Sequence, residues 1–258
     1  MGSEQFKRYK TPISGLMLGG VIGLIVAVAL GSVLPWRPPP KKPDFAAAGD
    51  APKTMFHAPS FNGFVNQQGQ PVDSSAFKGK VLLVTFMYPY CTRVCPTLAS
   101  RMVNLETLLR QRGLQDRVQL LSFNVDPEGA APREMSRFMR QYGADPNSAL
   151  WQFLTAPAAL TARVLKRGFH ADYRKIATDQ LEQVFAQQRK DGTYHYVPSM
   201  RNPLADESHP DYAIIHNSSA IIVGVDGVVR YVLGDANTVS DAVMLNDIIR
   251  VLRKEGRA

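Results

Sequence analysis

The fold of this chain of 258 residues is decided by the segment Val81–Pro96, whose sequence reads VLLVTFMYPYCTRVCP. The apolar run from Val81 to Met87 predicts a buried strand, and Thr97 to Arg112 predicts a helix downstream of it. Between them lie Cys91 and Cys95, which are the only two cysteines of the chain. A turn from a strand into a helix favours the thiolate form of a cysteine, because helix-end amides and the helix dipole stabilise negative charge there. We therefore expect these two cysteines to bind a metal ion, to exchange disulfides, or to do both.

The spacing of the cysteines separates the possible chemistries. Three residues lie between Cys91 and Cys95, whereas thioredoxin-type oxidoreductases have two. Positions four apart share one face of a helix, so both sulfurs can converge on one ion. A soft ion needs a further ligand, and the candidate is His216, just before the apolar run that starts at Ala220. Two thiolates and one imidazole suit Cu(I). From position alone, a hydrogen-bonded core histidine is the alternative.

The remaining apolar runs predict the order of the other elements. We expect a hairpin, a parallel strand, two helices, a second hairpin and a final helix, over residues 61–80, 118–125, 132–142, 157–166, 220–233 and 240–253. This order, with the cysteines directly after the first core strand, is that of an α/β domain of the thioredoxin-like class. A polar stretch at about 174–212, with a helix over 179–189, is interpreted as an insertion of unknown role.

The N-terminus predicts a membrane anchor. Lys7, Arg8 and Lys10 precede an uncharged apolar run that is long enough to cross a bilayer. We expect a cytoplasmic tail over 1–12, a transmembrane anchor helix over 13–35, a Pro/Ala-rich linker over 36–54 and the soluble domain over 55–258. A cleaved signal sequence is the alternative. The predicted location is the bacterial inner membrane, crossed once, with the soluble domain in the periplasm.

The charge of the chain does not indicate a nucleic-acid partner. The formal net charge is +8 and the sequence pI is near 9.6, but the lysines and arginines are scattered and no nucleic-acid motif accompanies them. A solvated surface is the expected consequence.

Several stretches together resemble the Sco/SenC family. Val84–Leu98 is similar to the copper-site segment of that family, and Ser122–Glu128 resembles its Ser-Val-Asp-Pro-Glu strand end. Tyr142–Asp145 and Trp151–Thr155 resemble the stretch that follows, and His216 falls where the family places its histidine ligand. The resemblance covers roughly residues 58–252.

This resemblance implies a thioredoxin-like fold that binds copper, as Cu(I) or Cu(II), through Cys91, Cys95 and His216. It places Asp126 near the site, where a carboxylate orients a ligand or caps the following turn. The family helps to assemble the dinuclear copper centre of cytochrome c oxidase, by donating copper or by reducing the cysteines of that centre. The implied partners are the copper-receiving subunit of the oxidase or another copper chaperone.

Some positions depart from the pattern of the family. Thr92 stands where proline is common, and Arg93 where an acidic residue is common. Ile215 and Asn217, on either side of His216, also differ from the usual residues. We expect the cation of Arg93 to lower the pKa of the neighbouring thiols.

Two functions are compatible with the sequence. The first is a metallochaperone, which is not an enzyme. The second is a thiol-disulfide oxidoreductase that uses a redox-active Cys91–Cys95 disulfide to reduce partner cysteines. The cysteine spacing and the absence of a proline directly before Ala220 speak against the second. The spacing gives no support for a peroxidase, and a purely structural bridge closing so short a loop would constrain little.

Overall fold

The structure is a computed structural model that describes residues 50–193, 202–207, 211–216 and 218–256. The predicted tail, anchor helix and most of the linker therefore lie outside the described residues. Within the described part of the chain, no helix has the length and apolarity needed to span a membrane.

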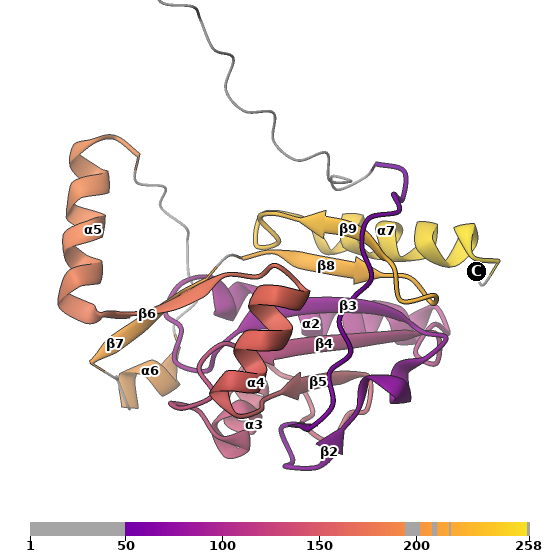
Figure 1. Cartoon of the computed structure of the whole chain (residues 1–258), viewed down its shortest axis with the longest axis horizontal. Coiled ribbons are helices and arrows are strands. Elements are labelled where there is room, and N and C mark those ends of the chain that lie inside the picture. The colour runs from indigo at the N-terminus through magenta and orange to yellow at the C-terminus, as the bar shows by residue number, and fades with distance from the viewer. Residues whose placement is uncertain (1–49, 194–201, 208–210, 217, 257–258) are drawn as a thin grey trace, which may run out of the picture. The chain divides into compact units, whose positions relative to one another are not determined.

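A five-stranded sheet forms the centre of the domain, in the order β5-β4-β3-β8-β9 (Figure 1). The first three of these strands run parallel to one another, and β8 pairs antiparallel with both β3 and β9. Every residue of β3 and β4 is buried, as predicted for strands that are covered on both faces. The bounds are β3 Val81–Met87, β4 Val118–Asn124, β5 Trp151–Leu154, β8 Ala220–Val223 and β9 Val229–Leu233.

Helices cover both faces of this sheet. Figure 1 shows α4 (Ala158–Ala162) in front of the sheet and α2 (Val94–Gln111) behind it. The helix α7 (Asp241–Lys254) contacts both α2 and β3. The helix α3 (Pro132–Gln141) turns Met135, Phe138 and Met139 inward, as its apolar spacing predicts. A single π-helical turn, η2 (Arg163–Gly168), continues α4. The predicted helices are confirmed, although α2 begins three residues earlier than expected.

An aromatic cluster on β4 packs the N-terminal hairpin onto the sheet. The ring of Phe123 lies 5.2 to 6.5 Å from the rings of Phe61, Phe64, Phe86 and Phe169. The predicted hairpin is present as β1 (Phe64–Val65) and β2 (Pro71–Val72), followed by the 3-10 helix η1 (Ser74–Phe77). The cluster therefore joins segments from four parts of the chain.

The start of the described chain is held by the domain. The backbone N–H groups of Met55 and Ala58 donate to Val229 and Gly227, at 3.2 and 2.9 Å. The hydroxyl of Tyr231 donates to the carbonyl of Asp50 at 2.6 Å. Residues 50–54, which the sequence places in the linker, are thus fastened to the edge of the sheet.

The insertion is smaller than the polar stretch suggested, because its two ends are strands. β6 (Tyr173–Ala177) and β7 (Tyr212–His216) pair as an antiparallel ribbon apart from the main sheet. Between them lie α5 (Thr178–Lys190), close to the predicted helix, and the short α6 (Pro203–Glu207). Figure 1 shows α5 standing at the end of this ribbon.

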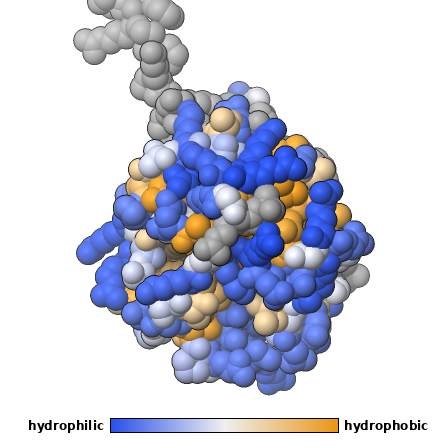
Figure 2. All heavy atoms as spheres, turned by 90° about the vertical axis from the view of Figure 1, so that its right-hand side faces the viewer, coloured by the Kyte–Doolittle hydropathy of each residue, from blue (hydrophilic) through white to orange (hydrophobic). Residues whose placement is uncertain are grey.

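The surface agrees with the solvated face that the scattered charges predict. In Figure 2, hydrophilic residues cover most of the face shown, and apolar residues are interspersed among them. Among the described residues, the one large hydrophobic side chain classed as exposed is Val184 on α5.

Replacing Phe123 by alanine tests the role of the aromatic cluster. The side chain is fully buried, and we expect Phe123→Ala to lower the free energy of unfolding by about 3–5 kcal/mol, because it leaves a cavity between four rings. Urea denaturation of the soluble domain measures this, with the exposed Val184→Ala as the control. A loss under about 1 kcal/mol would show that the cluster is not central to stability.

Candidate metal centre

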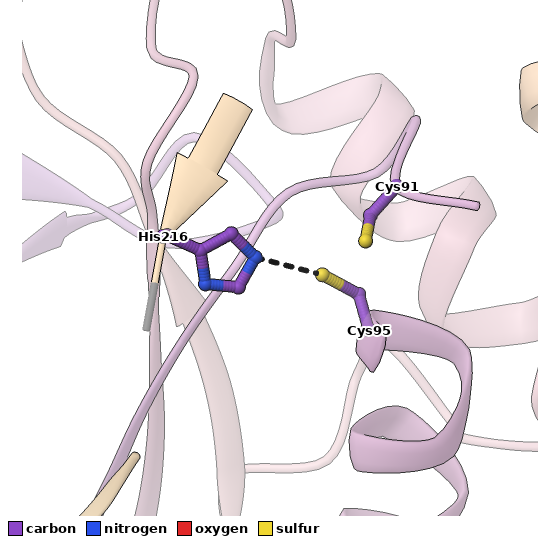
Figure 3. A group of neighbouring side chains, drawn as sticks. All are labelled: Cys91, Cys95 and His216. Carbon is purple, nitrogen blue, oxygen red and sulfur yellow. Dashed lines mark hydrogen bonds between the residues drawn. The ribbon is translucent and has the colours of Figure 1, made fainter. Parts of the chain in front are cut away.

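Cys91, Cys95 and His216 meet at one end of the sheet. One ligand atom from each of the three lies within 4.8 Å of the others. The Sγ of Cys95 and the Nε2 of His216 are 3.5 Å apart, and Figure 3 shows the three side chains converging. They come from a loop, from the first turn of a helix and from the end of a strand. The three predicted ligands are therefore brought together by the tertiary structure.

The two cysteines are placed by the connection from β3 to α2. The N–H of Cys91 donates to the carbonyl of Tyr88 at 3.3 Å, which forms a turn directly after β3. Because α2 begins at Val94, Cys95 lies inside its first turn, where the sequence analysis had expected loop. Pro96 is tolerated there, since the first N–H groups of a helix have no intrahelical partner.

His216 is placed by β7, a strand that the sequence analysis missed. It is the last residue of β7 and stands opposite Tyr173 of β6. Tyr88 links this strand to the cysteine loop: its hydroxyl accepts the N–H of Ile214 at 3.2 Å, and its ring meets the ring of His216 edge-on at 5.9 Å. Tyr88 lies in the segment Val84–Leu98 that resembles the family's copper-site segment, but its contact with the strand of His216 was not predicted from the sequence.

Asp126 lies at the end of β4 and serves two neighbours. Its carboxylate accepts the N–H of Gly129 at 3.3 Å and the hydroxyl of Tyr212 at 3.0 and 3.2 Å. The first bond is the cap of the following turn that the sequence suggested. The second reaches β7 four residues before His216, so Asp126 acts on the strand that carries His216.

Asn202 is a buried contact of the cysteine loop that the sequence analysis did not single out. Its side-chain nitrogen donates to the carbonyls of Pro89 and Cys91, at 2.8 and 2.7 Å. An asparagine in a polar stretch gives no signal of such a contact, because the acceptors are backbone atoms of a distant segment.

Of the other histidines, the two that the structure describes lie apart from this group. The ring of His170 packs edge-on against Phe56 at 5.0 Å, and His57 pairs through its backbone with Val228. His195 and His209 lie outside the described residues.

The two thiols differ in acidity. Burial opposes ionisation of Cys91, but hydrogen bonds from Cys95 and His216 and the charge of His216 hold its pKa well below the ordinary value. Burial raises the pKa of Cys95 well above its ordinary value, reinforced by its hydrogen bond to Cys91 and by the charge of that thiolate. The two opposite shifts share one cause, the contact between the two thiols, which favours the charged form of Cys91 over that of Cys95.

The charge of Arg93 is not placed as the sequence suggested. Arg93 lowers the pKa of Cys91 through a backbone hydrogen bond. Its guanidinium lies over the ring of Phe185, 4.4 Å from the centroid. The helix α5 thereby contacts the middle one of the three residues between Cys91 and Cys95.

A cavity of about 270 Å³ opens onto the site. Its walls are the cysteine loop, β7 and the inner side of α5, with Leu181, Val184, Phe185 and Gln188 facing Cys91 and His216. The insertion thus forms one wall of the cavity beside the cysteines.

The three side chains fit a soft metal ion. The bond from a thiolate sulfur to an ion of the size of zinc is about 2.3 Å long. Two ligand atoms on opposite sides of one such ion therefore stand at most about 4.6 Å apart. The three ligand atoms lie within 4.8 Å of one another, which is the range of separations that one shared ion requires. Sulfur and imidazole ligands select copper in its reduced state, or zinc, over hard ions such as magnesium.

A thioredoxin-like domain with a Cys-Cys-His site is the class of protein that this fold and geometry define. The profile of the family described as SCO1/SenC matches residues 51–253, and the chain belongs to that family.

Individual relatives agree with this assignment. The chain is 33% identical over 92 residues to the SCO1 protein homolog of Bacillus subtilis, a match that covers 36% of this chain and 46% of the relative. The match therefore spans about half of the length of that curated protein.

Solved structures show the same fold. A SCO1/SenC family lipoprotein from Bacillus anthracis superposes with a TM-score of 0.56 at 22% identity, covering 76% of this chain and 95% of that one. The copper-bound ScoI of Bradyrhizobium japonicum gives 0.54 at 21% identity, covering 77% and 100%. These likenesses confirm the predicted thioredoxin-like α/β fold.

The unequal thiols lead to a spectroscopic prediction. We expect the reduced domain to show the ultraviolet absorbance of one thiolate per molecule at neutral pH, because the pKa of Cys91 is lowered and that of Cys95 raised. In His216→Ala the absorbance should appear only at higher pH, since a hydrogen bond and a positive charge are lost. The control is His57→Ala, and an unchanged titration in His216→Ala would contradict the assigned cause.

A second prediction concerns Asp126. Burial raises its pKa above the ordinary value, although the hydrogen bond from Tyr212 works in the opposite direction. A carboxyl group with a raised pKa stabilises the fold when protonated and loses that contribution as the pH rises through its folded pKa. The free energy of unfolding of the wild type should therefore fall relative to Asp126→Asn between acidic and neutral pH. Urea denaturation at several pH values tests this, with the exposed Asp172→Asn as the control; the opposite slope would refute it.

Proposed function

We propose that this chain is a membrane-anchored copper-binding protein that delivers copper during assembly of the dinuclear copper centre of cytochrome c oxidase. The observation that carries the proposal is the convergence of two thiols and one imidazole from three separate elements, within 4.8 Å, on the fold of the SCO1/SenC family. Copper is the cargo in this proposal, and Cys91, Cys95 and His216 are its ligands.

Access to the sulfurs favours metal binding over thiol exchange. Exchange requires a thiolate that attacks a disulfide of another protein, and its rate depends on access as well as on acidity. Cys91 is 5% exposed and Cys95 is fully buried. A single ion passes such an opening more readily than a disulfide of a folded partner does. The convergence of His216 on the pair is also needed for metal binding and is not needed for exchange.

The alternative is a thiol-disulfide oxidoreductase that reduces cysteines of a partner outside the cytoplasm. One feature favours it, namely the contact between the two cysteines, in which the pKa of Cys91 is lowered and that of Cys95 is raised; such a pair supports a redox-active Cys91–Cys95 disulfide. Both functions use the same pair, and they differ in their need for His216.

The proposed location is the bacterial inner membrane, with the domain on the periplasmic side. The apolar run within residues 13–35 supports the anchor, and the short tail before it and the cysteine pair after it support this orientation. The charge pattern does not decide the orientation, because basic residues lie on both sides of the run. A related protein of Bacillus anthracis is described as a lipoprotein, which is another way of holding such a domain at a membrane. The proposed partner is the copper-receiving subunit of the oxidase, or another copper chaperone.

Copper titration of ligand variants tests the proposed function. We expect the reduced protein to bind one Cu(I) tightly under anaerobic conditions, in competition with a chelator. Cys91→Ser and Cys95→Ser should abolish this binding. His216→Ala should weaken it by at least about tenfold, since even the loss of a residue that only supports a metal ligand costs about 10–100-fold.

The control for this titration is His57→Ala, which removes an exposed imidazole remote from the site. Weak binding that is the same in the wild type and in His216→Ala would rule out the three-ligand site. Reduction of a partner disulfide by His216→Ala at the wild-type rate would then favour the oxidoreductase.

A further inference from the structure

The insertion between β6 and β7 is attached to the cysteine loop on both sides of Cys91. On one side, Asn202 donates to the carbonyls of Pro89 and Cys91. On the other side, the ring of Phe185 on α5 lies against the guanidinium of Arg93. The loop therefore contacts a segment whose residues lie 92 to 113 positions away in the sequence.

Asn202 is itself firmly held. It is 4% exposed, and its side-chain oxygen accepts the N–H of Leu204 at 3.2 Å. Leu204 and Ala205 are 1% exposed, and their helix α6 contacts α3. The donor that reaches the cysteine loop is thus fixed to the core of the domain.

The chemistry of the amide suits this task. Its nitrogen carries two protons, which match its two carbonyl acceptors, and its oxygen bonds to Leu204. A buried carbonyl that loses its donor retains the full cost of desolvation. Removing Asn202 therefore favours any movement of the loop that exposes these carbonyls to water, and such a movement displaces Cys91.

We propose that Asn202 is a positioning residue for the metal site: it fixes the backbone of Cys91 so that the sulfur of this residue meets Cys95 and His216. This inference rests on the proposed copper-binding function. Metal ligands must be held close to their productive positions, and the residues that hold them contribute strongly to affinity. The insertion thereby becomes part of the copper site without supplying a ligand.

Two substitutions separate the donor from the rest of the side chain. Asn202→Asp keeps the size of the side chain and an acceptor for Leu204, but turns the donor into an oxygen that faces two carbonyls. Asn202→Ala removes all of these bonds. Gln187→Ala is the matched control, because it truncates another amide of the insertion at an exposed position outside the walls of the cavity. Val251→Ala, in the core on α7, controls for lowered stability.

The experiment measures Cu(I) affinity and amide hydrogen exchange on the full chain in detergent. We expect both Asn202 variants to bind Cu(I) roughly 10–100-fold more weakly than the wild type. Without metal, their amides at 90–93 should exchange faster. Both controls should keep the wild-type affinity and the wild-type exchange in this loop. Wild-type affinity and exchange in both Asn202 variants would overturn the inference and leave the copper site standing.

Hydrogen exchange also separates this inference from the proposed function. If the wild type fails to bind Cu(I), the proposed function is wrong, and the exchange at 90–93 still decides the role of Asn202. Faster exchange in the Asn202 variants but not in the controls would confirm that Asn202 fixes the backbone of Cys91. Equal exchange in all variants would remove that role.

Discussion

The backbone pairing of β3 is the constraint on which the rest of the structure depends. This strand pairs in parallel with β4 along its whole length, from Val81 opposite Val118 to Met87 opposite Asn124. On its other side it pairs with β8, with Thr85 opposite Ala220. Since β7 ends four residues before Ala220, this register brings His216 beyond the end of β3, where the cysteine loop begins. A shift of one residue would turn every side chain of the strand to the opposite face.

Burial and the neighbouring polar groups act in opposite directions on the ionisation of the Cys91 thiol. A buried thiolate is unfavourable unless neighbouring groups compensate it. Here the hydrogen bond from Cys95, the charge and hydrogen bond of His216 and a backbone hydrogen bond of Arg93 provide that compensation. Burial, the hydrogen bond to Cys91 and the charge of Cys91 raise the pKa of Cys95 and so oppose a second negative charge in the pocket. A soft metal ion needs both sulfurs as thiolates, so its binding releases any proton that the pair still holds.

Around this centre, three polar contacts connect the cysteine loop and β7 to the remainder of the domain. Tyr88 joins the loop to β7, Asp126 holds β7 through Tyr212, and Asn202 holds the backbone of Cys91. Each of them involves a buried or half-buried group whose loss leaves a partner unsatisfied. The insertion contributes twice to the site: α5 forms a wall of the cavity, and the side chain of Asn202 bonds to the backbone of Cys91. The elements β3, α2 and β7 position the three candidate ligands, and the segment between β6 and β7 supplies part of their surroundings.

The sequence by itself determined the core strands, most helices and the identity of the two cysteines as a reactive pair, because these depend on local apolar periodicity and on spacing along the chain. It pointed to His216 only through the resemblance to a family, since an imidazole between isoleucines also suits a core. The tertiary structure alone decided the pairing of β6 with β7, the start of α2 at Val94, and the contacts of Tyr88 and Asn202. The physical reason is that the hydrogen bonds of Asn202 and Tyr88 join residues 111 to 126 positions apart in the sequence. Their partners are backbone groups, which every residue carries and which therefore leave no signal in the sequence.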